Sequence, residues 1–202
     1  MRILVGCEYS GVVRDAFIAK GHQAVSCDLL PTERPGPYHQ GSVLDLLGDG
    51  WDMAIFHPPC THLAVSGAKW FRAKAALQKE ALAFVSQLLQ APIPRIALEN
   101  PVGVIASKIK PPTQIVQPWM FGDPFEKTTC LWLKGLPPLR ATQIVEPPPR
   151  VVLSSGKTLP SWYNLPPSAE RGKLRSLTFP GMAAAMAEQW DGAPYASQLS
   201  FF

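Results

Sequence analysis

Strand-like apolar runs alternate with helix-like segments along the first 100 residues of this chain. The apolar runs are residues 2–6, 23–30, 51–57 and 95–98. Between them, the segments 10–22 and 73–90 repeat their apolar residues at helical spacing. Strands that alternate with helices pair into a parallel sheet covered by crossover helices. The pattern therefore predicts an α/β fold, with a further strand at 128–135 and a closing helix at 181–190.

The composition supports one folded domain and restricts where the protein works. Hydrophobic residues make up 47% and charged residues 17% of the 202 residues, which allows a sizeable core. The chain has no apolar run of about 18 residues, as a membrane span needs, and its N-terminus lacks the pattern of a signal peptide. We therefore expect a cytoplasmic protein with no membrane partner, whose four cysteines are reduced. The net charge of +4 permits a nucleic-acid partner without requiring one.

Proline distinguishes the second half of the chain from the first. Most of the 22 prolines follow residue 91. Proline is excluded from regular helices and central strands, so this half is expected to consist of loops and short edge strands. The stretch 136–168 has no strong periodicity, and we expect either a small accessory lobe or a mobile loop there.

Four candidate groups follow predicted strands: the turn Gly6–Gly11, Asp28, Cys60 and Glu99. Ligands bind at the carboxyl ends of parallel strands, so these groups predict a site at one edge of the sheet. The turn either offers free helix N–H groups to a ligand or is a plain strand-to-helix turn. Asp28 either binds ribose hydroxyls or is a helix cap or a solvated residue.

Cys60 lies in the segment HPPCTH (57–62), directly after a predicted strand. It could be a small buried residue, a zinc ligand together with His57 and His62, or a nucleophile. The two prolines before it hold its side chain at a fixed place, which argues against a plain core position. The spacing of these residues does not match a zinc knuckle, and the motif of zinc base deaminases is absent, so no metal is expected.

Glu99 follows an apolar strand, and partial burial there is expected to raise the pKa of its carboxyl group. A raised pKa would let Glu99 carry a proton to or from a heterocycle near neutral pH, in support of a nucleophilic Cys60. The alternative is a structural glutamate held in a salt bridge.

Five segments carry a resemblance to the DNA cytosine carbon-5 methyltransferases, and they occur in the order of that family. HPPCTHLAVSG looks like the Pro-Pro-Cys nucleophile loop, and LEN (98–100) looks like the Glu-Asn motif. LVGCEYSGVVRDAFIAKGHQAVSCDL stands where the family has its donor loop, first helix and acidic strand end. KTTCLWLKGLP (127–137) is similar to a strand with a basic residue, and TFPGMAAAMAEQW (178–190) to the closing helix.

The resemblance covers residues 1–135 and 176–192 and indicates a compact, phage-like member, which would work in the host cytoplasm. It implies a Rossmann-like class I fold that uses S-adenosylmethionine as cofactor. The catalytic domain would comprise 1–135 and 176–202, and 136–175 would form a small Pro-rich region that contacts the target.

The resemblance also implies a DNA-modifying enzyme that methylates cytosine carbon 5 in DNA. The Cys60 thiolate would attack carbon 6 of a base that is flipped out of the duplex. Glu99 would bind ring nitrogen 3 and the exocyclic amine, Asn100 would tie down the Pro-Pro-Cys loop, and Lys127 would complete the catalytic set. The residues implied for donor binding are Gly6, Cys7, Glu8, Tyr9, Ser10, Gly11, Asp28, Leu29 and Pro58.

Candidate nucleic-acid contacts combine cations, an aromatic ring and a hydroxyl, which can hold phosphates and stack on bases. They are Ser66, Lys157, Trp162, Arg171, Lys173 and Arg175. The chain departs from the family in the bulky charged Glu8 of its donor loop and in its short target region. Two alternatives follow: the same chemistry on a single strand or nucleotide, or with another electrophile, and a degenerate paralogue that binds nucleic acid without turnover.

Overall fold

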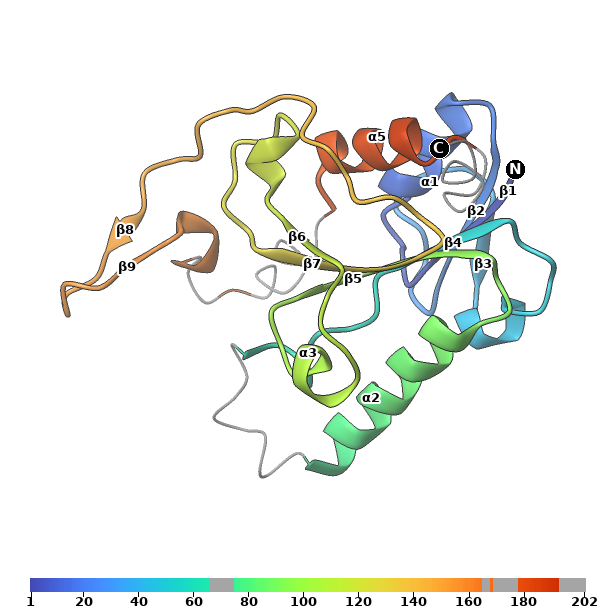
Figure 1. The fold of residues 1–202 in the computed structure, drawn as a ribbon, viewed down its shortest axis with the longest axis horizontal. Helices are drawn as coiled ribbons and strands as arrows, with labels where there is room; N and C mark the ends of the chain where they lie inside the picture. The colour runs from blue at the N-terminus through green and yellow to red at the C-terminus, as the bar shows by residue number, and fades with distance from the viewer. Residues whose placement is uncertain (66–74, 165–167, 169–177, 193–202) are drawn as a thin grey trace, which may run out of the picture.

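The computed structural model describes residues 1–65, 75–164, 168 and 178–192, and within them a seven-stranded sheet organises the fold (Figure 1). Its strands are β1 (Arg2–Gly6), β2 (Gln23–Asp28), β3 (Tyr38–Gln40), β4 (Met53–Phe56), β5 (Arg95–Pro101), β6 (Gln114–Val116) and β7 (Thr129–Lys134). The order across the sheet is β3-β2-β1-β4-β5-β7-β6. Strands β1 to β5 run parallel, whereas β7 is antiparallel to both of its neighbours. The expected α/β class, with a mostly parallel, Rossmann-like sheet, is confirmed.

Helices cover both faces of this sheet (Figure 1). The helices α1 (Val12–Ala19) and α5 (Pro180–Gln189) pack against each other on one face. The other face carries α2 (Ala75–Gln90) and the short α3 (Ile105–Lys108). Short 3-10 turns are η1 (Val43–Leu46), η3 (Pro118–Met120) and η4 (Ser161–Asn164).

Two hydrophobic cores, one on each face, follow from the alternation of side chains along the strands. In β1, Ile3 and Val5 belong to the core under α1 and α5, whereas Leu4 between them belongs to the core under α2. Phe17 of α1 and Leu88 of α2 are completely buried in these two cores. Since both faces of the central strands are covered, β4 is apolar throughout and β1 is apolar after Arg2, which is the pattern seen in the sequence.

The long elements agree with the sequence predictions, and the short ones were missed. The predicted strands correspond to β1, β2, β4, β5 and β7, and the predicted helices to α1, α2 and α5. Residues 73 and 74 of the predicted second helix lie outside the described residues. Leu77 near the start of α2 is 44% exposed, because the buried residues of this helix, Val85 and Leu88, come from its later turns.

Much of the proline-rich stretch is irregular, as its composition predicts. It contains a two-stranded ribbon of β8 (Val151–Val152) and β9 (Thr158–Leu159), which extends away from the sheet (Figure 1). The division of the chain into a catalytic domain and a target-contact region stays a prediction. In the described part of the chain, every helix is too short or too polar to cross a membrane.

Candidate active site

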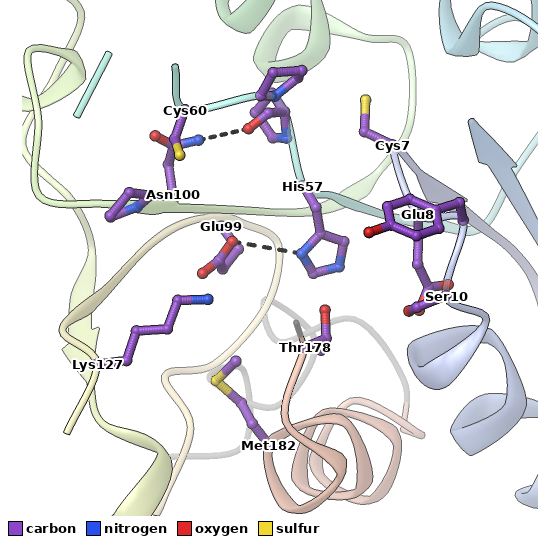
Figure 2. Close-up of a pocket in the computed structure, with 14 residues that line it drawn as sticks. Cys7, Glu8, Ser10, His57, Cys60, Glu99, Asn100, Lys127, Thr178 and Met182 are labelled. Carbon is purple, nitrogen blue, oxygen red and sulfur yellow. Dashed lines mark hydrogen bonds and ion pairs between the residues drawn. The ribbon is translucent and has the colours of Figure 1, made fainter. Parts of the chain in front are cut away.

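A pocket of about 130 Å³ lies at the carboxyl ends of β1, β4 and β5 (Figure 2). Its walls come from segments far apart in the sequence: residues 7–10, 57–60 and 99–101, with Lys127, Thr178 and Met182. The strand register explains this convergence, because Gly6 lies beside Phe56 and Phe56 lies beside Leu98. Residues that follow these positions therefore share one edge of the sheet, where parallel sheets bind their ligands.

The loop that carries Cys60 begins where two prolines end β4, because proline has no N–H for the ladder. The side-chain Nδ2 of Asn100 donates a hydrogen bond to the carbonyl of Pro58 at 2.8 Å, and Asn100 is 1% exposed. The resemblance implied that Asn100 ties down this loop, and its catalytic role stays a prediction. The Cys60 thiol is reduced and exposed, and Figure 2 shows it beside Asn100 at the rim of the pocket.

The chain after Cys60 is fastened to the segment that follows β5. Val65 N–H donates to Val102 O at 3.0 Å, and Val104 N–H donates to Leu63 O at 2.9 Å. Gly103 allows this approach, because a Cβ at that position would collide with the Leu63 carbonyl. Both flanks of Cys60 are thus held by β5, which carries Glu99 and Asn100, and by the segment that directly follows it.

Glu99 faces His57 and Lys127 inside the pocket (Figure 2). Its Oε2 lies 3.6 Å from His57 Nδ1, which is the distance of an ion pair rather than of a short hydrogen bond. Burial alone would raise the pKa of Glu99, but the His57 imidazole and the Lys127 ammonium together hold that pKa below its ordinary value. The expectation of a raised pKa was therefore wrong, and Glu99 is a carboxylate at neutral pH.

Lys127 brings a positive charge to a largely dry part of the pocket. The residue is 9% exposed, and its Nζ lies 5.5 Å from the ring centre of Phe179 and 5.9 Å from that of Trp162. Trp162 was expected to stack on bases, but it is 7% exposed and packs against Phe125 and Phe179. That prediction is corrected: the ring belongs to the core and supports the wall beside Lys127.

Glu8 occupies the start of α1, and this changes the expected function of the turn after β1. Its buried carboxylate accepts the N–H of Val13 at 2.6 Å and that of Arg14 at 3.3 Å. Ser10 Oγ donates to the same carboxylate at 3.2 Å. These are N–H groups that a helix start otherwise leaves open. The expectation that they are free for a ligand is therefore corrected, because Glu8 already satisfies them.

The other predicted donor contacts divide into two groups. Cys7, Tyr9, Ser10 and Pro58 line the pocket together with Glu8, whereas Gly6, Gly11, Asp28 and Leu29 lie outside its lining. Asp28 Oδ1 accepts the N–H of Leu30 at 3.0 Å. The Asp28 charge nevertheless acts on the turn. The pKa of Cys7 is raised to about 12, mainly by burial and next by the negative charge of Asp28.

The predicted nucleic-acid contacts are only partly described. Ser66, Arg171, Lys173 and Arg175 lie outside the described residues. Lys157 is exposed and directly precedes β9. The remaining basic candidate therefore lies on the ribbon that extends away from the sheet.

His57, Thr178 and Met182 line the pocket, although the sequence did not single them out for it. His57 was considered as a metal ligand with Cys60 and His62, but across residues 1–65, 75–164 and 178–192 no three His, Cys, Asp or Glu side chains gather to hold a metal. The signal for His57 was its place directly after β4, beside Cys60 in the same loop. Met182 comes from the closing helix, and nothing local in the sequence places it near Glu99.

Comparisons with known proteins leave the function to be inferred from the residues of this chain. No protein-family model matches the sequence, and no curated protein matches it. One similar solved structure is a proposed DNA modification methyltransferase encoded within a prophage of E. coli. It is 13% identical, with a TM-score of 0.40, and the match covers 66% of this chain and 46% of that one. The chain thus spans less than half the length of that protein.

Proposed function

We propose that this protein is an S-adenosylmethionine-dependent methyltransferase that modifies carbon 5 of cytosine in DNA through a covalent adduct with Cys60. One observation carries the proposal: Cys60, Glu99, Asn100 and Lys127, which lie in three separate segments, line the same pocket. A thiol, a carboxylate and an ammonium group around one small cavity are the groups that addition to a pyrimidine ring requires.

Cys60 is the nucleophile in this proposal. Its thiolate adds to carbon 6 of cytosine, and the electron pair of the carbon 5–carbon 6 double bond moves into the ring. The exposure of Cys60 allows a base to approach it, provided that the base leaves the stack of a duplex. Asn100 keeps the loop in place during this step through its hydrogen bond to Pro58.

Glu99 and Lys127 stabilise the adduct. Glu99 is a carboxylate before the base binds. When the base binds, Glu99 takes up a proton from water, passes it to ring nitrogen 3 as negative charge develops there, and accepts a hydrogen bond from the exocyclic amine of cytosine. The Lys127 charge lies near Glu99 in a site of low exposure, where electrostatic stabilisation is stronger than in water.

The turn after β1 fits a positively charged donor. Glu8 lines the pocket, and the Asp28 charge reaches the same turn, so this wall is acidic. When bound, S-adenosylmethionine would supply an electrophilic methyl group on a cationic sulfur for carbon 5. Loss of the carbon 5 proton to water then restores the double bond and releases the Cys60 thiolate from carbon 6. The residues that would hold it are those of the turn 7–10, together with Pro58 and Asp28.

Methylation of DNA tests the proposal directly. The protein is incubated with labelled S-adenosylmethionine and unmodified duplex DNA, single strands or nucleotides, and the digested nucleosides are analysed. We expect carbon-5-methylated deoxycytidine, none of it with Cys60→Ala, and at least about 100-fold less with Glu99→Gln. Cys130→Ala is the matched control, because its buried thiol lies outside the pocket lining, and it retains activity.

Covalent trapping separates this function from binding alone. DNA that contains 5-fluorocytosine is expected to form a stable adduct with the wild type and none with Cys60→Ala. The absence of any methylated product on all three substrates would overturn the proposal. Donor or DNA binding without an adduct would instead identify a binding protein, the reading that the Glu8-capped helix favours.

A further inference from the structure

His57 connects the two halves of the pocket. The backbone N–H of His57 donates to the Gly6 carbonyl at 2.9 Å, so the loop is still hydrogen-bonded to β1 at this residue. Its side chain is 11% exposed and lies between Glu99 on one side and the turn with Glu8 and Ser10 on the other (Figure 2). The two ring nitrogens therefore face different groups.

The Nδ1 side of the ring faces Glu99. The His57 and Glu99 side chains are 11% and 13% exposed and approach to 3.6 Å, so little water lies between them or around them. A carboxylate in such a site is held by its charged and polar neighbours, because water does not solvate it fully. The His57 imidazole approaches Oε2 to 3.6 Å and can hold that oxygen in place.

The Nε2 side of the ring lacks a hydrogen-bond partner among the residues that the structure describes, although the atom is buried. In Figure 2 this nitrogen points away from Glu99, toward the space between Ser10 and Thr178. Buried polar atoms are nearly always hydrogen-bonded in folded proteins, and leaving one unsatisfied is costly. A group of the bound ligand is therefore the natural partner of Nε2.

We propose that His57 is a positioning residue with two separate functions: Nδ1 orients Glu99 toward the base, and Nε2 binds a polar group of the ligand. This inference rests on the proposed function and extends it to a residue that the mechanism above does not use. Nδ1 holds Oε2 in place while Glu99 acts on ring nitrogen 3. No proton passes through His57, so this residue does not change the proton balance of the reaction.

Other ionisable groups also face His57, so pH dependence alone would not isolate it. Cys7 and Glu8 face it from the turn after β1, Cys60 from its own loop, Glu99 from β5 and Lys127 from the segment before β7. The decisive comparison is therefore between two substitutions, each of which places a nitrogen near the position of one of the two ring nitrogens. Asparagine places an amide nitrogen near the position of Nδ1, and glutamine places one near the position of Nε2.

The two substitutions are expected to separate kcat from affinity. His57→Asn keeps a donor toward Glu99 but loses the ligand contact, so its kcat stays within about 10-fold of wild type while KM rises. His57→Gln keeps the ligand contact but leaves Glu99 unsupported, so KM is retained while kcat falls by about 100-fold or more. The inference would be overturned by wild-type kinetics in both variants. It would also be overturned if kcat and KM changed in the same way in His57→Asn and in His57→Gln.

A measurement without turnover keeps this inference distinct from the proposed function. The Glu99 carboxyl, labelled with 13C and assigned by Glu99→Gln, is titrated by NMR in the ligand-free protein. We expect the pKa of Glu99 to rise in His57→Gln, because the contact with His57 that opposes the effect of burial is then lost. In His57→Asn we expect this pKa to stay near that of wild type. An unchanged pKa in His57→Gln would contradict the positioning function even in a protein that methylates DNA.

Folding and function are also separated by this design. A wild type without methylated product but with the expected titration would contradict the proposed function and leave the His57–Glu99 pairing supported. If His57→Gln does not fold, as judged by circular dichroism, His57→Ala replaces it in the titration, with the same expected rise in the pKa of Glu99.

Discussion

The four cysteines differ in ways that single out one thiol for chemistry. Cys60 is exposed, whereas Cys27 and Cys130 are buried and Cys7 is only partly accessible. Burial, reinforced by the Asp28 charge, raises the pKa of Cys7 to about 12 and that of Cys27 to about 11. Burial and then the Glu99 charge raise the pKa of Cys130. Thiols with raised pKa values stay protonated at neutral pH and react slowly, because the thiolate is the nucleophile.

Thiol labelling therefore has an expected outcome. With a disulfide reagent such as DTNB at pH 8, we expect one fast-reacting thiol per chain in the folded protein. Cys60→Ala removes this fast phase, and the matched control Cys7→Ala retains it. Two or more fast thiols in the wild type, or a fast phase that survives in Cys60→Ala, would contradict the distinction between Cys60 and the other three.

At the scale of a single element, α1 begins with a cap that comes from the turn before it. Gly11, at the start of the helix, has a φ of 71°, and its own position offers no side chain to cap the helix. Glu8 takes over that function by accepting the N–H groups of Val13 and Arg14. A carboxylate at this end is also favoured by the helix dipole. The turn is thus stabilised by the same residue that makes this wall of the pocket acidic.

Removal of this cap is expected to destabilise the protein. Glu8→Ala lowers the free energy of unfolding by about 1–2 kcal/mol, and Glu8→Gln by less, since its amide oxygen can still accept a hydrogen bond. Urea unfolding measures both changes. The control is Glu80→Ala on the exposed side of α2, which is expected to stay within about 0.5 kcal/mol of wild type. Equal stabilities of Glu8→Ala and Glu80→Ala would contradict the capping function.

Elements were predictable where the local sequence pattern decides them. The long runs that became β1, β4, β5 and α2 have clear periods, whereas β3 and β6 contain three residues each, too few to show a period. The capping by Glu8 was not predictable, because it depends on how the turn folds back on α1. The lowered pKa of Glu99 was also not predictable from the sequence, since His57 and Lys127 approach Glu99 from other segments of the chain.

At the scale of the whole molecule, the sheet joins two cores into one unit. Leu131 of β7 belongs to the core under α1 and α5, whereas Leu98 of β5 belongs to the core under α2. Both residues are fully buried, and their strands are hydrogen-bonded neighbours. Loss of packing on one face therefore loosens the strands on which the other face depends.

Cavities in either core are expected to weaken the same cooperative unit. Leu98→Ala and Leu131→Ala each lower the free energy of unfolding by about 2–5 kcal/mol. Tryptophan fluorescence and far-ultraviolet circular dichroism should report a single, coincident urea transition in both variants. Separate transitions in either variant would show that the two faces unfold independently.

The wide spacing of the pocket walls along the chain has a consequence for synthesis. Met182 follows Cys60 by about 120 residues, so at the usual 5–20 residues per second it leaves the ribosome on the order of ten seconds later. During that interval the thiol is already made, but one wall of its cavity is missing. A nascent chain is therefore chemically incomplete until its closing helix docks, which delays any reaction with nucleic acid until the polypeptide has folded around the site.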